Sequence, residues 1–258
     1  MRIIERGILL ALALGCAGAS GDDLEAYRVE LTTSVWWVPP KGAVRAGQLP
    51  VDFASDLALG DSPTFFGRLV WKPGRRHKVI VEGSPYRFAG DHVLTRTVTF
   101  QGRVYSFNER IQSEAELDYF SAGYGYDILN GPSGHLGLSV SGAYFRASGT
   151  LAAPARSIEG SDEQTVGLPL VGLSFRRSPW PGSSVLSIQG DVKGISVGRY
   201  GHFVQGSLEA GVNWRWISVL GGYQFLNSDI HESTNRPQPS GVRTRFTGPI
   251  FTIQFRDR

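Results

Sequence analysis

The sequence is poor in the features that mark helical membrane proteins, disulfide-stabilised domains and nucleic-acid-binding proteins. It has one cysteine and one methionine in 258 residues. Beyond its amino-terminal segment, no apolar run reaches the roughly 18 residues that a transmembrane helix needs. The net charge is +3 with the basic residues scattered, so no nucleic-acid partner is expected. Any membrane crossing must therefore use strands closed into a barrel, because lipid cannot satisfy an open sheet edge.

The abundance of glycine and aromatic residues favours strands and turns. Glycine accounts for 33 residues and aromatic residues for 11% of the chain, while charged residues make up 19%. Long amphipathic helices would need more alanine, leucine, lysine and glutamate. The composition indicates an all-β protein.

The first residues have the pattern of an export signal. Arg2 and Arg6 make the start basic, Ile8 to Leu14 form a short apolar core, and Ala17-Gly18-Ala19 offers a small-x-small cleavage site. We expect a cleaved signal peptide at residues 1–19 and one domain at residues 20–258, exported without a thiol. An alternative is that Cys16 is a lipidated lipoprotein cysteine, although Ala13 and Leu14 depart from the usual cleavage box.

Strict alternation in two segments carries the fold prediction. From Tyr27 to Trp37 the odd positions are mostly apolar, and from Val204 to Trp216 the even positions are apolar. Both runs exceed the usual soluble strand and match a tilted bilayer crossing. A soluble sandwich or a lipocalin-like barrel would show the same period. The membrane interpretation is favoured because aromatic residues gather near strand ends, where they would form interfacial girdles: Tyr27, Trp37, Trp71, Trp214, Trp216, Phe251 and Phe255.

Turn signals divide the chain into ten strands of a single antiparallel, up-and-down transmembrane β-barrel, with eight or twelve strands as alternatives. The expected strands are residues 27–38, 64–72, 77–88, 110–129, 135–147, 164–177, 184–197, 202–216, 217–227 and 242–255. Tight connectors alternate with long ones at 39–63, 89–109, 148–163 and 228–241. This alternation predicts periplasmic turns and outer loops.

Short motifs across the chain resemble a family of uncharacterised outer-membrane barrels of Gram-negative bacteria. The motifs are Phe65-x-x-Arg68-x-x-Trp71, Pro73-Gly74-Arg75-Arg76-His77, Tyr124 with Tyr126, and Gly167-Leu168-Pro169-Leu170-Val171-Gly172. The resemblance implies a fold and an outer-membrane location, and no activity. The ending Phe251-Thr252-Ile253-Gln254-Phe255 resembles the carboxy-terminal signature read by the barrel assembly machinery, although Arg256-Asp257-Arg258 follow it.

Charged residues are expected on the lumen face in both signs. They suit either a polar channel or a closed lumen in which opposite charges pair, and a ten-stranded barrel is narrow enough for side chains largely to fill it. The predicted lumen-facing charges are Arg28, Glu30, Arg68, Lys72, Lys78, Glu82, Glu114, Glu116, Asp118, Asp191, Lys193, Glu209 and Arg215.

Two local features suggest chemistry. Glu114, Glu116 and Asp118 would repel one another on one strand face unless a cation or arginines neutralise them, so calcium binding is possible, and simple pairing or solvation of the carboxylates is favoured over it. Outer-membrane hydrolases are the second class: an acid and a histidine could meet in the outer loops, as His92 with Asp91, or His231 with Asp229 and Glu232. The motifs of lipid A deacylases and omptin proteases are missing, and no cofactor or metal site is expected.

The sequence therefore predicts an outer-membrane barrel that is structural or adhesive, or a weak conduit for small solutes with a largely filled polar lumen. The alternative is a hydrolase acting on lipid A or peptides at the extracellular rim. The expected partners are outer-membrane lipids, lipopolysaccharide and, during biogenesis, the barrel assembly machinery. The sequence leaves the oligomeric state open.

Overall fold

The computed structural model describes residues 23–257 apart from 47–49, 181–182, 197–200 and 232–239. The predicted signal peptide at residues 1–19, with Cys16, lies outside these residues. Within the described ranges, no helix is long and apolar enough to cross a membrane.

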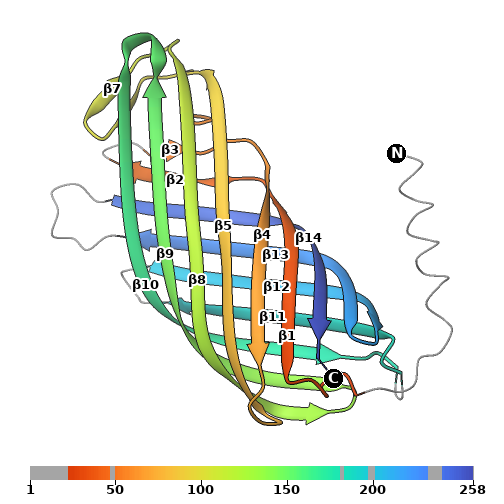
Figure 1. The fold of residues 1–258 in the computed structure, drawn as a ribbon. Coiled ribbons are helices and arrows are strands. Elements are labelled where there is room, and N and C mark those ends of the chain that lie inside the picture. The colour runs from red at the N-terminus through yellow and green to blue at the C-terminus, as the bar shows by residue number, and fades with distance from the viewer. Residues whose placement is uncertain (1–22, 47–49, 181–182, 197–200, 232–239, 258) are drawn as a thin grey trace, which may run out of the picture.

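Ten antiparallel strands form a closed barrel, as the sequence predicted (Figure 1). The first and last strands close it, with pairs from Glu30↔Arg256 to Trp36↔Ile250. In chain order the barrel strands are β1 (Val29–Val38), β4 (Ser62–Trp71), β5 (His77–Val93), β8 (Arg110–Gly131), β9 (Gly134–Ala153), β10 (Ile158–Arg177), β11 (Leu186–Ser196), β12 (Gly201–Trp214), β13 (Ile217–His231) and β14 (Ser240–Arg256).

Four short strands lie outside the barrel wall. β2 (Lys41–Ala46) pairs with the upper part of β14, and β3 (Pro50–Asp52) pairs with β2. β6 (Val98–Phe100) and β7 (Arg103–Tyr105) form a hairpin between β5 and β8. We call the end of the barrel with these additions the loop end, and the opposite end, where β4 turns into β5 and β8 into β9, the turn end.

All four of the expected long connectors contain strand residues, and in two of them the barrel strands continue well beyond their predicted ends. The segment predicted as a connector at 148–163 continues β9 and β10 around one turn of 3-10 helix, Pro154–Arg156. In the segment 89–109, β5 continues to Val93 before the β6–β7 hairpin. Alternation persists through both segments, but with charged residues outward, so they lacked the apolar face that identified the other strands.

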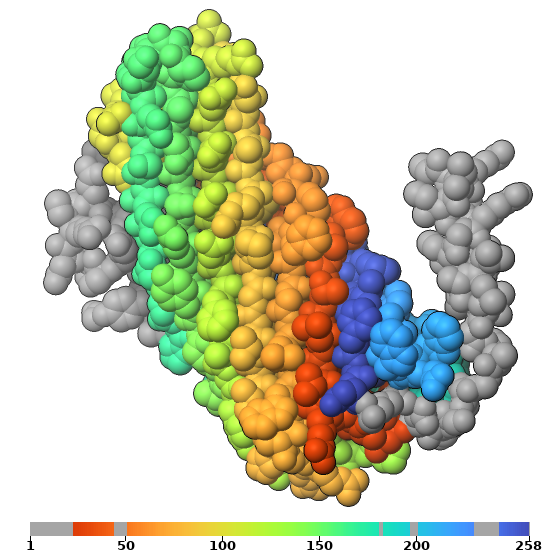
Figure 2. Space-filling view, in the orientation of Figure 1, coloured from red at the N-terminus to blue at the C-terminus, as the bar shows by residue number. Residues whose placement is uncertain are grey.

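The extra strand length builds an extension that we call the arm. It consists of residues 84–93 of β5, 110–119 of β8, 145–153 of β9 and 158–170 of β10. Figure 2 shows it as a column standing above the body of the barrel. Its inner face has its own apolar cluster, in which Tyr105 of the hairpin donates a hydrogen bond to the carbonyl of Leu151 at 2.8 Å.

The last residues explain the unusual ending of the sequence. Arg256 keeps the inward parity of Thr252 and Gln254 and is buried. Asp257 Oδ1 accepts hydrogen bonds from the backbone N–H of Arg28 and of Val29, at 2.8 and 2.5 Å. The two charges after Phe255 therefore belong to the barrel seam.

Candidate functional site: the filled lumen

The lumen at the turn end is occupied by an ion network around two carboxylates from the start of the chain. Glu30 on β1 accepts hydrogen bonds from Arg176 Nη2 on β10 at 2.8 Å and from Arg256 Nε on β14 at 2.6 Å. All three side chains are at least nine-tenths buried. Tyr27 lies among them, with its ring 4.1 Å from Lys72 Nζ. Strands from three parts of the barrel thus converge on one buried carboxylate.

A second group of charges closes the same end. Glu25 lies before β1, and its carboxylate contacts Lys72 Nζ at 2.5 Å, His135 Nδ1 at 2.8 Å and Arg176 Nη1 at 3.1 Å. Lys78 Nζ contacts Asp127 Oδ1 at 2.8 Å. Burial acts to raise the pKa of Glu25, but the positive charge of Arg176 and the hydrogen bond with His135 hold it well below its usual range.

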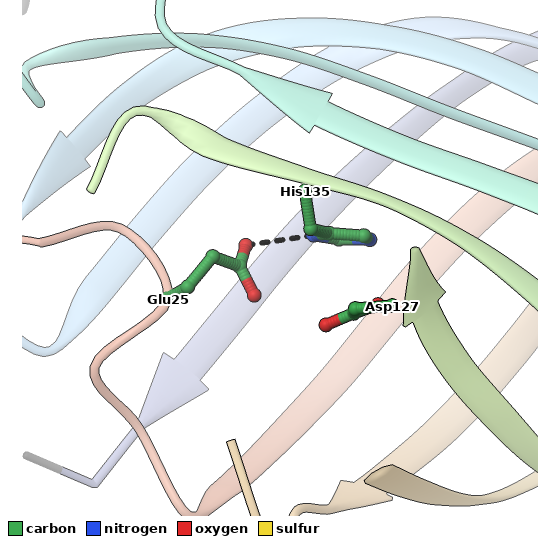
Figure 3. Close-up of side chains that lie close together, drawn as sticks. All are labelled: Glu25, Asp127 and His135. Atoms are coloured by element: carbon green, nitrogen blue, oxygen red, sulfur yellow. Dashed lines mark hydrogen bonds and ion pairs between the residues drawn. The ribbon is translucent and has the colours of Figure 1, made fainter. Parts of the chain in front are cut away.

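Donor atoms of Glu25, Asp127 and His135 lie within 4.8 Å of one another, a spacing that could hold a metal ion (Figure 3). Two lysines already contact these carboxylates, since Lys72 lies against Glu25 and Lys78 against Asp127. The negative charges of Glu25 and Asp127 are already neutralised by these two lysines, so the group fits an ion network better than a metal centre.

A third set of charges lies farther into the barrel. Arg68 Nε on β4 donates to Glu82 Oε2 on β5 at 3.0 Å, and its Nη2 lies 3.3 Å from Asp191 Oδ1 on β11. Lys193 also contacts Glu82. Below the apolar layer the described residues put six acids against six bases in the lumen, so the filling carries no net formal charge: Glu25, Glu30, Glu82, Asp127, Asp191 and Glu209 with Arg68, Lys72, Lys78, Arg176, Lys193 and Arg256.

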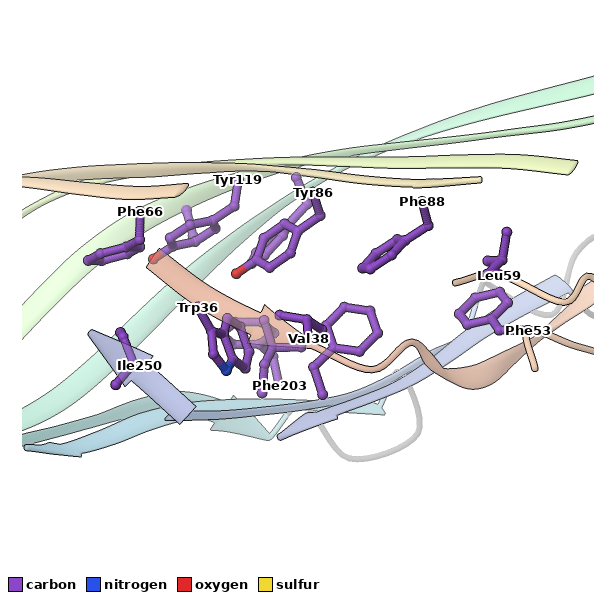
Figure 4. Close-up of a cluster of buried hydrophobic side chains, with 14 of the residues drawn as sticks. Trp36, Val38, Phe53, Leu59, Phe66, Tyr86, Phe88, Tyr119, Phe203 and Ile250 are labelled. Carbon is purple, nitrogen blue, oxygen red and sulfur yellow. The ribbon is translucent and has the colours of Figure 1, made fainter. Parts of the chain in front are cut away.

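Toward the loop end the filling of the lumen becomes apolar (Figure 4). Trp36 and Tyr86 are fully buried with ring centroids 6.0 Å apart, and Phe246 lies 5.9 Å from Tyr86. Phe145 on β9 and Phe203 on β12, which are separated by two strands of the wall, meet with ring centroids 4.8 Å apart. A packed aromatic layer of this kind excludes water, so the lumen has two fillings of different chemistry in series.

Small cavities remain between the charged groups. One of about 90 Å³ lies among residues that include Arg68, Glu82, Lys193 and Arg176, and one of about 10 Å³ adjoins Gln205. Three atoms lining the smaller one, Gln205 Oε1, Glu209 Oε2 and Gln224 Nε2, are buried with no hydrogen-bond partner among the described residues. A water molecule needs roughly 10–15 Å³ of such space and several polar partners, so these positions fit ordered water.

The structure places the predicted lumen charges in two groups. Glu30, Lys72, Lys78, Glu82, Lys193 and Glu209 are buried on the lumen side, with Arg68 and Asp191 partly exposed among them. The prediction is wrong for Arg28, which is exposed before β1 begins, and for Arg215, which is exposed in the tight turn between β12 and β13.

The inward assignment of Glu114, Glu116 and Asp118 is also wrong. In the lower part of β8 the even positions, such as Phe120 and Tyr124, face outward, and this fixes the parity of the whole strand. The upper part stands above the apolar belt, so its outward face carries charge. There Arg87 contacts Glu116 at 3.3 Å and Asp118 at 2.7 Å. These ion pairs reduce the repulsion between the acids for which the sequence suggested calcium.

Most of the predicted girdle residues are exposed on the outer face. Trp37, Trp71, Trp214, Trp216 and Phe251 are each more than two-fifths exposed. Phe255 is partly buried and stacks on Trp216, with ring centroids 5.8 Å apart. The prediction is wrong for Tyr27, which is 6% exposed inside the lumen, because regular strand alternation begins only at Val29.

The histidines that the sequence suggests for hydrolysis do not form the acid–His pairs in the part of the chain that the structure describes. Asp91 is exposed and accepts two hydrogen bonds from Arg110, whereas the ring nitrogens of His92 have no hydrogen-bond partner among the described residues. Asp229 pairs with Arg243. The side chain of His231 and all of Glu232 lie outside the described residues.

Sequence reasoning missed several members of the network. Arg176 lies inside the predicted strand 164–177 and follows from its alternation, and Arg256 follows from that of β14 once the strand is extended beyond Phe255. No sequence pattern could have placed Glu25 in the lumen, because it precedes the first strand and so belongs to no alternating segment. It reaches the network because the chain folds back under the barrel before β1. Asp127 and His135 fall at strand ends next to a tight turn, where charged residues are ordinary.

The closed wall, outward apolar belt and inward polar residues define an outer-membrane-type β-barrel. The fold is similar to the outer membrane protease OmpT from Escherichia coli, with a TM-score of 0.58 and 11% identity over 89% of this chain and 97% of that one. The translocator domain of the autotransporter NalP from Neisseria meningitidis is similar with a TM-score of 0.45 and 14% identity, over 99% of this chain and 96% of that one. Ail, the attachment invasion locus protein of Yersinia pestis, is similar with a TM-score of 0.36 and 10% identity, over 87% of this chain and 99% of that one.

The sequence matches no protein-family model and no curated protein. Identities this low show the fold alone, so the role of the chain has to be argued from its own lumen and surface.

Proposed function

We propose that this protein is a bacterial outer-membrane barrel with a closed lumen, whose structural or adhesive role is carried by its loop end. The observation that carries the proposal is the double filling of the lumen. The turn end holds a neutral, paired ion network, and the loop end holds packed aromatic side chains. A solute would have to break ion pairs and then cross an apolar layer.

The turn end faces the periplasm and the arm projects outside the cell in this proposal. Outer-membrane lipids and lipopolysaccharide would surround the apolar belt, and the barrel assembly machinery would insert the chain. The charged outer face of the arm supports this orientation, since Arg87, Arg110 and Arg146 pair with acids above the belt. Long outward projections of barrels are common partner surfaces.

Planar-bilayer conductance of the refolded full chain tests the closed lumen. A filled lumen should show no discrete current steps, while a general porin in the same bilayer shows that channels are detectable. Regular steps from the wild-type protein would contradict the proposal and favour a conduit for small solutes. Abolition of such steps by an additional bulky lumen residue, as in Ser141→Phe, would locate the path in the barrel.

A further inference from the structure

The outermost strand of the arm has a long unpaired edge. β10 pairs with β9 along its whole length, from Ile158↔Ala153 to Arg177↔Gly134. On its other side it pairs with β11 only from Val171 onward, and β11 ends at Ser196. Between Ile158 and Leu170 no described strand covers that side, so backbone N–H and C=O groups point outward without a sheet partner.

Pro169 marks where the β10–β11 ladder stops. It lies two residues beyond Val171, the last β10 residue paired with β11, and therefore shares the parity of that residue. Because proline has no N–H, it cannot donate the next bond of that ladder. Residues of the same parity farther up the arm, such as Thr165, then direct their N–H toward the open side.

The opposite edge of the arm, formed by β5, is covered by a loop. The backbone N–H of Gly60 donates to the carbonyl of Ala89 on β5 at 3.1 Å, and Ser113 binds the carbonyl of Leu57 at 2.6 Å. The loop after β3 thus covers the β5 side. On the β10 side, the backbone of Gly160 that contacts the Tyr105 hydroxyl has the parity that faces β9, and among the described residues no loop donates a hydrogen bond to the open edge between Ile158 and Leu170.

Charge distinguishes the partners that could occupy the open edge. Residues 158–170 include Glu159, Asp162 and Glu163 and no lysine or arginine. Glu163 is paired with Arg146 at 2.9 Å, whereas Glu159 and Asp162 have no ion-pair partner among the described residues. Two copies paired through the middle of this edge would bring their acids together, which is unfavourable for a second copy of the chain.

We propose that the edge of β10 between Ile158 and Leu170 is a docking site for an extended, basic segment of another protein, which adds a strand to the arm. The main-chain groups of β10 supply hydrogen bonds, and the carboxylates of Glu159 on the outer face and Asp162 on the inner face attract positive side chains on either face of the added strand. This inference rests on the outward orientation given to the arm in the proposed function. It does not depend on whether the lumen is closed.

The test uses a fluorescent synthetic peptide of alternating lysine and valine, with the refolded full chain in zwitterionic micelles. Fluorescence anisotropy should report saturable binding. The same peptide with alternate backbone N–H groups methylated cannot form the ladder and should not bind. An alternating glutamate and valine peptide should not bind either.

Variants locate the site on β10. Thr165→Pro removes one outward donor without touching the β9 ladder and should weaken binding by about five-fold, the value of one hydrogen bond. Glu159→Lys with Asp162→Lys should weaken it further. Glu114→Lys is the matched control, because Glu114 is also an arm acid without an ion-pair partner among the described residues but lies on β8, inside the sheet, and it should leave binding unchanged.

Absence of peptide binding by the wild-type protein would overturn the inference, as would equal binding by the methylated peptide. Equal weakening by Glu114→Lys would show general attraction to an acidic surface and would also overturn it. If Thr165→Pro fails to fold, shown by loss of heat-modifiable gel mobility, the methylated peptide on wild-type protein still decides. Bilayer conductance judges the closed lumen independently.

Discussion

Glu30 of the first strand and Arg256 of the last strand form a buried ion pair, with Oε2 and Nε 2.6 Å apart, at the seam where the barrel closes. Arg176 reaches the same carboxylate from the opposite wall at 2.8 Å. One carboxylate therefore binds two guanidinium groups and connects three strands, and Glu25 supplies the second negative charge through its own pair with Arg176.

Glu30→Gln should destabilise the protein strongly, because it leaves two buried arginines without their shared carboxylate. Breaking a buried pair by removing one partner costs about 3–5 kcal/mol. Urea unfolding of the refolded protein in micelles would measure the loss. Glu163→Gln, which breaks the exposed pair with Arg146, should cost at most about 1 kcal/mol. Equal losses in the two variants would contradict the role given to the seam.

The alternating segments allowed the barrel, its ten strands and much of its lumen to be predicted, because a period of two separates the faces wherever one face must be apolar. The parity of β8 could not be predicted from its upper half. There the outward residues Glu114 and Glu116 meet water, and inward residues such as Leu117 pack in the core. The usual relation of polar residues to the lumen is reversed in that segment.

The ion network was the least predictable part. Glu25 and Arg176 are 151 positions apart in sequence and meet only because the chain folds back under the barrel before β1. No local period encodes such a contact. The alternation of β10 carries Arg176 to the lumen, but its partner could be identified only from the structure.

The outward apolar belt predicts a contrast between two exposed residues. Leu208 on β12 is 57% exposed and Val104 on the hairpin is 51% exposed. Leu208→Lys should lower the unfolding free energy in lipid vesicles by about 2–4 kcal/mol, because it puts a charge in the hydrocarbon region. Val104→Lys should change it by less than about 0.5 kcal/mol. Similar small effects for both would show that the belt does not face lipid.

The aromatic layer should behave as a packed core. Phe246 is 2% exposed and lies 5.6 Å from the ring of Phe88. Phe246→Ala should cost about 3–5 kcal/mol, the usual loss for a truncated core phenylalanine. Phe251→Ala on the outer face provides the comparison, and lipid tails can fill the space that it leaves. A smaller loss at Phe246 than at Phe251 would mean that the lumen is hydrated at this level.

Two loop-end ion pairs should make the loop end acid-sensitive. The hydrogen bond from Arg96 lowers the pKa of Asp56, and that from Arg156 lowers the pKa of Glu109. A lowered folded-state pKa contributes stability that is present above the ordinary carboxyl pKa and is lost as pH falls through the lowered value. Melting curves of wild-type protein and of Asp56→Asn with Glu109→Gln should therefore differ at neutral pH and converge in acid. A gap that persists in acid would contradict this origin.

The seam also has a consequence for how the protein is made. Glu30 is synthesised early, whereas Arg256 emerges 226 residues later. Until that last strand arrives, the carboxylate of Glu30 lacks one of its two guanidinium partners, and the edges of β1 and β13 are open. A chain truncated before β14 would lack both this guanidinium group and the strand that closes the wall, so the charge balance of the lumen and the closure of the barrel depend on the same last strand.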